Sequence, residues 1–400
     1  MRFVAPSAKL SQLAALAAVI LLSLTSYGQS RPVTETGKSE QVVNLLILGD
    51  SISWGQGLKD EHKAWFLVKK WLELNTGRIV HARVEAHSGA VIGELTPSGV
   101  DPRGNYSLDG ELSRAEPTIN AQIDNALLSF ADPAQVDLVL VDGCINDVDA
   151  RRLLNAANTP DNIRELAQAK CGAPVEALLN RITSTFPAAH VVVFGYYPII
   201  TEYTANDLFM RALAKRFYTP DADTPRLNDK GLRARLIAIS REWYQTSDQM
   251  LADAARKIDS QLKARGSHQR VMFADAAFRP EHSFAANKTR LWGFDASTLR
   301  KILVLLTLGK VELRTNDERR SQRSDLCKAL LKKSENETPE QKDVREDRLL
   351  RCRLAAVGHP NRKGAAMYAD AIGKLLKPLL MDTGWLKGVS TIAVPANPLQ

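Results

Sequence analysis

Ser51 stands where an enzyme that works through a covalent intermediate would need a nucleophile. It follows a short apolar run, residues 43–48, which ends at Gly49 and Asp50. Such a run bounded by glycine is typical of a buried strand, and reactive side chains of open α/β sheets gather beyond the carboxyl ends of their strands. Ser51 is therefore a candidate nucleophile, although a serine in this place could equally cap the next helix.

His359 is the candidate base for this serine. A serine hydroxyl is a weak nucleophile and needs a neighbouring group that takes its proton, and histidine serves because its pKa lies near working pH. His359 precedes a segment, residues 361–376, whose apolar side chains recur with helical spacing. We expect the loop before this last helix to hold the imidazole over the edge of the sheet.

Two further segments could stabilise the oxyanion that forms when a serine attacks a carbonyl. Gly89 follows the second predicted strand and Asn146 follows the third. Backbone amides and amide side chains are the usual donors, and losing one costs on the order of 10²–10³ in rate. The amides of Ser51 and Gly89 and the side chain of Asn146 are the candidates, while a plain turn-forming role is the alternative for Asn146.

Strand and helix patterns alternate along the chain, which favours βαβ units and a parallel sheet. The long helix is expected to be broken, residues 201–228 to be an irregular insertion and residues 96–113 a surface loop. The predicted strands are 43–49, 79–86, 136–141, 190–196 and 270–274, and the predicted helices are 60–74, 117–130, 175–186, 230–264 and 361–376.

Four short blocks, each at a strand exit or before the last helix, together resemble the sequence blocks of the SGNH or GDSL hydrolases. They occur in the family's order: Gly49-Asp50-Ser51, an isolated Gly89, Gly143-x-x-Asn146-Asp147 and His359-Pro360. Gly-x-Ser-x-Gly is absent from the sequence, so the chain does not resemble the α/β-hydrolases with their nucleophile elbow.

The resemblance implies an α/β fold, a three-layer α/β/α sandwich on a flavodoxin-like five-stranded parallel sheet with helical insertions. It implies ester hydrolysis through an acyl-serine intermediate, without a metal or organic cofactor. Carried over by position, Ser51 is the nucleophile and His359 the general base and then acid. Gly89 and Asn146 are the oxyanion donors.

One position departs from the family pattern. The family usually has an aspartate three residues before the histidine, and Ala356 occupies that position. A backbone carbonyl could orient the His359 ring instead, or a carboxylate from elsewhere, with Asp142 and Asp147 as candidates. Loss of activity is the remaining alternative.

The ends and insertions of the chain give the expected domain organisation. Residues 1–28 combine early positive charge, an apolar run over 13–24 and small residues near Gly28, which predicts a signal peptide and export to the periplasm or medium. The run is shorter than the ~20 residues of a spanning helix, so no transmembrane anchor is expected. A hydrolase domain should cover 42–380, with insertions about 201–228 and 310–353, and a tail should follow over 381–400.

Charge and cysteine content limit the possible partners. The formal charge is +8, but 53 Lys and Arg are interspersed with 45 Asp and Glu, so no nucleic acid partner is expected. The cysteine and histidine spacings do not match a structural zinc site. Four cysteines allow three pairings. Proximity favours Cys144 with Cys171 and Cys327 with Cys352, and free thiols are the alternative because a large core needs no cross-links.

The sequence thus predicts an exported serine esterase or lipase that acts on a carboxylic ester. A lipid, a small acyl ester and an O-acetylated glycan are all candidate substrates. Two alternatives use the same residues or fold: an acyltransferase, and a non-catalytic module that binds envelope carbohydrate or a protein partner. The oligomeric state is not determined by the sequence.

Overall fold

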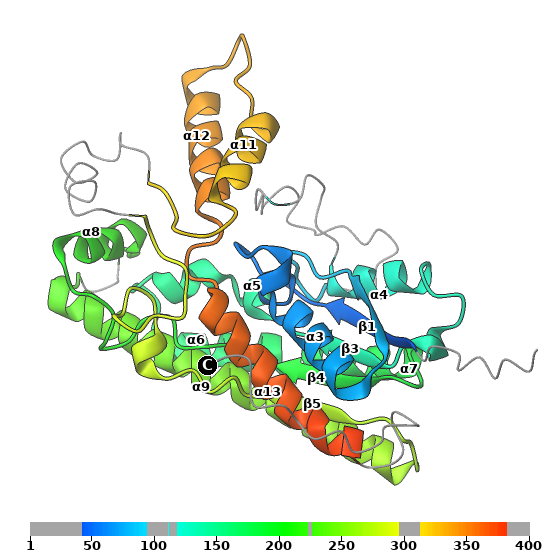
Figure 1. The fold of residues 1–400 in the computed structure, drawn as a ribbon. Helices are drawn as coiled ribbons and strands as arrows, with labels where there is room; N and C mark the ends of the chain where they lie inside the picture. Colours follow the sequence, from blue (N-terminus) through cyan, green and yellow to red (C-terminus); the bar gives the residue numbers. More distant parts are fainter. Residues whose placement is uncertain (1–41, 94–110, 112–117, 223–225, 296–312, 382–400) are drawn as a thin grey trace, which may run out of the picture. The chain divides into compact units, whose positions relative to one another are not determined.

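The computed structural model describes residues 42–93, 111, 118–222, 226–295 and 313–381 (Figure 1). The predicted signal peptide, nearly all of the predicted surface loop at 96–113 and all but the first residue of the predicted tail lie outside these residues. None of the helices in the described part of the chain is long and apolar enough to cross a bilayer.

A five-stranded sheet forms the centre of the fold, and all of its strand pairs are parallel. The spatial order β2-β1-β3-β4-β5 places the first strand next to the second and third, so three strand exits lie side by side. The central strands are β-branched and leucine-rich and are buried along their whole length, because helices cover both faces. The strands are β1 (Val42–Leu48), β2 (Ile79–Val84), β3 (Leu138–Val141), β4 (His190–Phe194) and β5 (Val271–Ala274).

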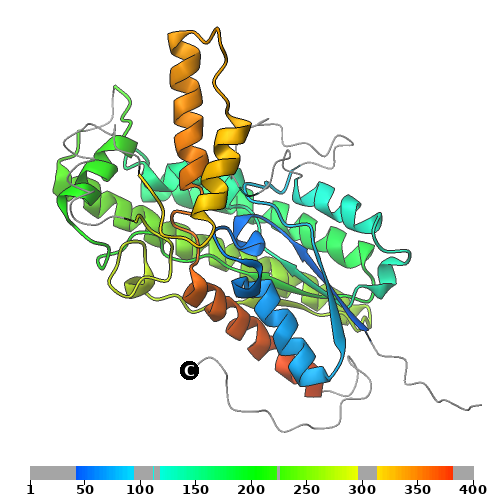
Figure 2. The ribbon, with the colours of Figure 1, turned by 45° about the horizontal axis from the view of Figure 1, so that its top comes forward.

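Helices cover both faces of this sheet, which confirms the predicted α/β fold class. Helices α3 (Ala64–Thr76) and α13 (Arg362–Met381) pack together on one face (Figures 1 and 2). The other face carries α4 (Ile119–Leu127), α6 (Pro160–Cys171), α7 (Ala173–Thr185) and α9 (Asp229–Ala264). Short elements complete the core: α2 (Ser51–Trp54), α5 (Ile145–Val148), η1 (Asp60–His62), η2 (Pro133–Gln135), η3 (Ala150–Leu154) and η4 (Pro280–His282).

Three helices differ from what the sequence predicted. Helix α9 runs for 36 residues without a break, because no glycine or proline interrupts it after Leu232 and one of its faces stays buried. Helix α6 was not predicted, although Thr159 before Pro160 is a start signal and its hydroxyl accepts from Asn162 N. The segment expected to be irregular contains α8 (Leu208–Phe217), which begins where Asp207 accepts from the amide of Met210.

The charged segment that was predicted to be an insertion contains a helical hairpin. Helices α11 (Arg320–Leu330) and α12 (Pro339–Leu354) lie side by side, and a disulfide between Cys327 and Cys352 joins them (Figure 1, orange). A second disulfide joins Cys144 to Cys171, so the pairing favoured by proximity is the one present. Because α12 ends at Leu354, the hairpin leads directly into the loop that carries His359.

Candidate active site

Two residues that are 308 positions apart in the chain meet beyond the carboxyl end of β1. The Oγ of Ser51, the first residue of α2, lies 2.7 Å from Nε2 of His359, which precedes α13. This distance is within hydrogen-bond range. A serine hydroxyl and an imidazole nitrogen so placed can exchange a proton, which is the contact that nucleophilic catalysis by serine requires.

The turn that presents Ser51 depends on a glycine and two buried polar side chains. Gly49 has φ +121°, and a Cβ at this position would lie 1.9 Å from Oδ1 of Asp142. The amide side chain of Gln122 accepts from the Gly49 N–H and donates to the Gly49 carbonyl, at 2.8 and 2.9 Å. Asp50 then caps α2 by accepting from the amide of Ile52. The turn that presents Ser51 is therefore fixed by Gln122 before it and by the Asp50 cap beside it.

A pair of carboxyl groups lies buried beneath this turn. Oδ1 of Asp142 accepts from the Asp50 amide at 2.9 Å and from the hydroxyl of Ser53. Burial and the neighbouring Asp142 raise the pKa of Asp50 well above its ordinary value. The phenol of Tyr196 donates to Asp50 at 3.3 Å. Asp50 therefore caps α2 and supports the turn from a buried position.

Hydrogen bonds from a neighbouring segment and from the loop after β4 hold the loop of His359. The amide of Trp292 donates to the His359 carbonyl at 2.7 Å, and the amide of Gly358 donates to the Trp292 carbonyl at 2.9 Å. The phenol of Tyr197 donates to the Gly358 carbonyl at 2.9 Å. The main chain on both sides of the imidazole is therefore fixed by partners more than sixty residues away.

The imidazole of His359 is neutral at ordinary pH. Burial and, to a smaller extent, the charge of Arg323 lower its pKa to about 4. The carbonyls of Ala356 and Val357 and the carboxylate of Asp317 act in the opposite direction. A neutral ring can accept a proton from Ser51, so the electrostatics keep the candidate base in its active form.

The far nitrogen of the imidazole has no carboxylate partner among the described residues. Nδ1 of His359 is buried and forms no hydrogen bond within them. Asp142 is bound to the nucleophile turn, and Oδ2 of Asp147 accepts from the amide of Ile92 at 3.1 Å. Neither of the two predicted acid candidates therefore holds the ring. The nearby carbonyls of Ala356 and Val357 are the groups that favour its protonated form.

The predicted oxyanion donors lie at the exits of the two strands that flank β1. Gly89 has φ +82° in the loop after β2, and Asn146 lies on α5 after β3. The Asn146 amide donates to the carbonyl of Ala90 at 3.0 Å, which joins the two exits directly. Both predicted donors thus stand on the loops next to the exit of Ser51.

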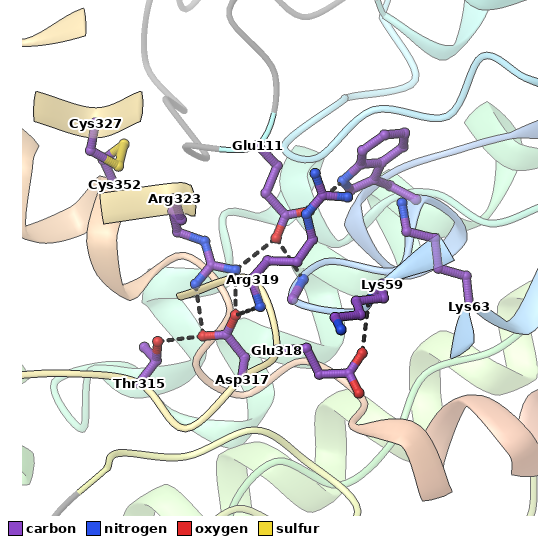
Figure 3. Close-up of polar contacts among 12 residues, drawn as sticks. Lys59, Lys63, Glu111, Thr315, Asp317, Glu318, Arg319, Arg323, Cys327 and Cys352 are labelled. Atoms are coloured by element: carbon purple, nitrogen blue, oxygen red, sulfur yellow. Dashed lines mark hydrogen bonds and ion pairs between the residues drawn. A yellow bond between two sulfur atoms is a disulfide. The ribbon is translucent and has the colours of Figure 1, made fainter. Parts of the chain in front are cut away.

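A buried ion network connects α11 to α2 (Figure 3). The guanidinium of Arg323, on α11, is fully buried and donates twice to Asp317, at 2.8 Å each, and to Glu111 at 2.6 Å. Glu111 also accepts from the indole of Trp54 at 2.9 Å and from the amide of Gly57 at 2.7 Å. The end of α2 and the start of the hairpin therefore share one carboxylate.

Sequence reasoning missed the residues that support the site. Gln122, the neighbouring Tyr196 and Tyr197, and Arg323 are buried polar side chains from three separate segments. A pair of tyrosines directly after a buried strand was the one signal available, since a buried phenol needs a hydrogen-bond partner. The described residues contain no group of three or more histidine, cysteine or acidic side chains that could bind a metal.

No protein-family model and no curated protein matches the chain. Solved structures do match. An extracellular lipase from Streptomyces rimosus is 16% identical over 62% of this chain and 87% of its own, with a TM-score of 0.37. A phospholipase A1 from Streptomyces albidoflavus NA297 is 15% identical over 63% and 87%, with a TM-score of 0.36.

A third match is a carbohydrate acetylesterase from Sinorhizobium meliloti, 16% identical over 61% of this chain and 87% of its own, with a TM-score of 0.30. All three matching structures are of lipases or esterases, and at these identities the similarity concerns the fold alone.

Proposed function

We propose that this protein is a serine hydrolase that cleaves carboxylic esters through an acyl intermediate on Ser51. The observation that carries the proposal is the 2.7 Å contact between Ser51 Oγ and His359 Nε2. It brings together the two residues that the sequence selected for these roles. The half-buried, neutral imidazole is in the protonation state that a general base needs.

The reaction follows from these positions. His359 Nε2 takes the hydroxyl proton as Ser51 Oγ attacks the ester carbonyl, and the negative charge develops on the carbonyl oxygen. The amides of Ser51 and Gly89 and the side chain of Asn146 donate to that oxygen. His359 then gives the proton to the leaving alcohol. A water molecule, activated by the same imidazole, hydrolyses the acyl-serine and restores the enzyme.

The site works as a Ser51–His359 dyad in this proposal. The imidazolium that forms during attack is stabilised by the carbonyls of Ala356 and Val357 and by the charge of Asp317. Because burial and Arg323 oppose protonation, His359 is a weaker base than a free imidazole. We therefore propose an enzyme that keeps its activity at acid pH.

We propose further that the enzyme is exported after cleavage of residues 1–28. The hydrolase domain covers 42–380 with insertions about 201–228 and 310–353, and residues 381–400 form a tail. The two buried disulfides agree with an oxidising compartment. A lipid ester, a small acyl ester and an O-acetyl group on a glycan all suit an exported enzyme of this chemistry.

Hydrolysis of nitrophenyl esters, from acetate to palmitate, by the purified protein tests the proposal. Ser51→Ala and His359→Ala should each lower kcat by at least ~10⁴-fold, because each removes one partner of a unit that acts together. The exposed Ser129 and His268 supply matched controls, and Ser129→Ala and His268→Ala should hydrolyse as the wild type does.

Labelling of the active serine separates the enzyme from a binding module on the same fold. A fluorophosphonate should label the wild type and leave Ser51→Ala unlabelled. An active Ser51→Ala variant would disprove the mechanism. A wild type that neither hydrolyses any ester nor reacts with the fluorophosphonate would favour the non-catalytic module.

A further inference from the structure

The helix that carries Asn146 begins and ends in a left-handed backbone conformation. Helix α5 has only four residues, and its two flanking residues, Cys144 with φ 111° and Asp149 with φ 72°, are not glycine. Residues with side chains rarely adopt such angles, and they persist there only where the surrounding structure forces them. Each end of α5 therefore needs something that holds it.

Local hydrogen bonds account for the C-terminal end. The carboxylate of Asp149 accepts from the Arg151 amide at 3.1 Å and pairs with the Arg151 guanidinium. Aspartate is among the residues that tolerate the left-handed region, because its side chain bonds to nearby backbone. This end is stabilised within a few residues of the chain.

The N-terminal end has a long-range restraint. Cys144 is fully buried and forms the disulfide to Cys171, the last residue of α6. Ile119 packs closely against the preceding Gly143, since a Cβ at this position would lie 2.6 Å from Cδ1 of Ile119. The disulfide is the one covalent bond besides the main chain that fixes this turn.

Three contacts of the active-site region depend on the direction in which α5 leaves this turn. The side-chain amide of Asn146 donates to the carbonyl of Ala90, and the carboxylate of Asp147 accepts from the backbone amide of Ile92. Both side chains therefore bind the loop after β2. The amide of Ile145 donates to the phenol of Tyr196 at 3.0 Å, and that phenol donates to Asp50 beside the nucleophile. A rotation at Cys144 would displace all three.

We propose that the Cys144–Cys171 disulfide is a positioning element for Asn146. It holds Cys144 in the left-handed turn from which α5 presents the oxyanion donor. The expected effect of the disulfide on kcat rests on the proposed function. Its expected effect on the conformation of α5 does not.

Two double variants that differ by one methyl group test this inference. Cys144→Gly/Cys171→Ala and Cys144→Ala/Cys171→Ala both lack the disulfide, but glycine adopts φ near +111° without strain and alanine does not. The glycine variant should keep kcat within about threefold of the wild type. The alanine variant should lose tenfold or more, approaching the ~10²–10³-fold cost of a lost oxyanion donor, with KM of both within about threefold.

The hydrogen-exchange protection of the α5 amides tests the conformation of the same turn independently of esterase activity. The glycine variant should keep the protection of residues 145–149 and the alanine variant should lose it. Equal kcat and equal exchange in the two variants would overturn the inference. A wild type without esterase activity, in which the two variants still differ in exchange, would support the positioning and refute the proposed function instead.

A variant that does not fold leaves a second comparison. If the alanine double variant fails to fold, Cys144→Asn/Cys171→Ala replaces it, because asparagine tolerates the left-handed region better than alanine. Its kcat should be lower than that of the glycine variant, and its amides at residues 145–149 should exchange faster. Both changes should be smaller than those expected for the alanine variant. Values equal to those of the glycine variant would count against the proposal.

Discussion

Arg323→Met removes the charge at the centre of the buried ion network and keeps an apolar stem of similar length. In the native protein the Arg323 guanidinium makes three hydrogen bonds to Asp317 and Glu111, and both carboxylates have at most 1% of their side-chain surface exposed. Removing one partner of a buried ion pair costs ~3–5 kcal/mol, since the remaining charge is left without compensation. We expect the free energy of unfolding to fall by this amount.

Neutralising the two acids at the same time separates charge from shape. Replacement of a whole buried network by neutral groups of similar volume is often neutral or stabilising. The triple variant Arg323→Met/Asp317→Asn/Glu111→Gln should therefore recover most of the loss. Urea denaturation followed by tryptophan fluorescence measures all three proteins. A triple variant as unstable as Arg323→Met would show that lost packing, and not uncompensated charge, causes the effect.

The same substitution should change the pH dependence of catalysis. The charge of Arg323 lowers the pKa of His359, whereas Asp317 raises it. Removing Arg323 therefore raises the pKa of His359, and the acid limb of kcat/KM should move to higher pH because the neutral imidazole is the active form. Arg320→Met is the matched control. Its pair with Asp295 is about half exposed and is worth ~0–1 kcal/mol. Equal effects of Arg323→Met and Arg320→Met on stability and on the acid limb would refute the reasoning.

Three further predictions follow from buried groups. Because His359 has a pKa of about 4, kcat/KM of the wild type should fall only below about pH 5, and a stopped-flow or pH-stat profile with an acid limb near 6.5 would contradict this. Burial raises the pKa of Asp248 to about 7, so its contribution to stability is full below pH 3.8 and is lost as pH rises through 7. Asp248→Asn should remove this decline, which amounts to up to about 3 kcal/mol between pH 5 and pH 8, in urea titrations. Gly49→Ala should lower the free energy of unfolding by several kcal/mol, since its Cβ would meet Asp142. Gly77→Ala should lower it by about 1 kcal/mol, because Gly77 has φ +65° and no atom lies within 4 Å of the added Cβ. Thermal denaturation of the two variants compares these losses.

Local patterns in the sequence determined most of the architecture. Apolar runs of strand length, alternating with helical spacing, predicted all five strands, because a buried strand needs apolar side chains wherever its partners lie. The same runs ended at Ser51, Gly89 and Asn146, so parallel strand exits alone predicted that these residues share one edge. Helix α6 was not predicted, although its local start signal, Thr159 before Pro160, is present in the sequence.

Only the tertiary structure decided which groups surround Ser51. The contact of His359 with Ser51 and the ion pair of the buried Arg323 with Glu111 each join segments that are far apart in the chain. The charge or hydrogen bond of a buried polar group is stable only beside its partner, and the partner's position is set by packing of the whole sheet. The sequence gives the residue type at each position and the separation of residues along the chain. The distance between two residues in space, and the dielectric around them, are set only when the chain folds.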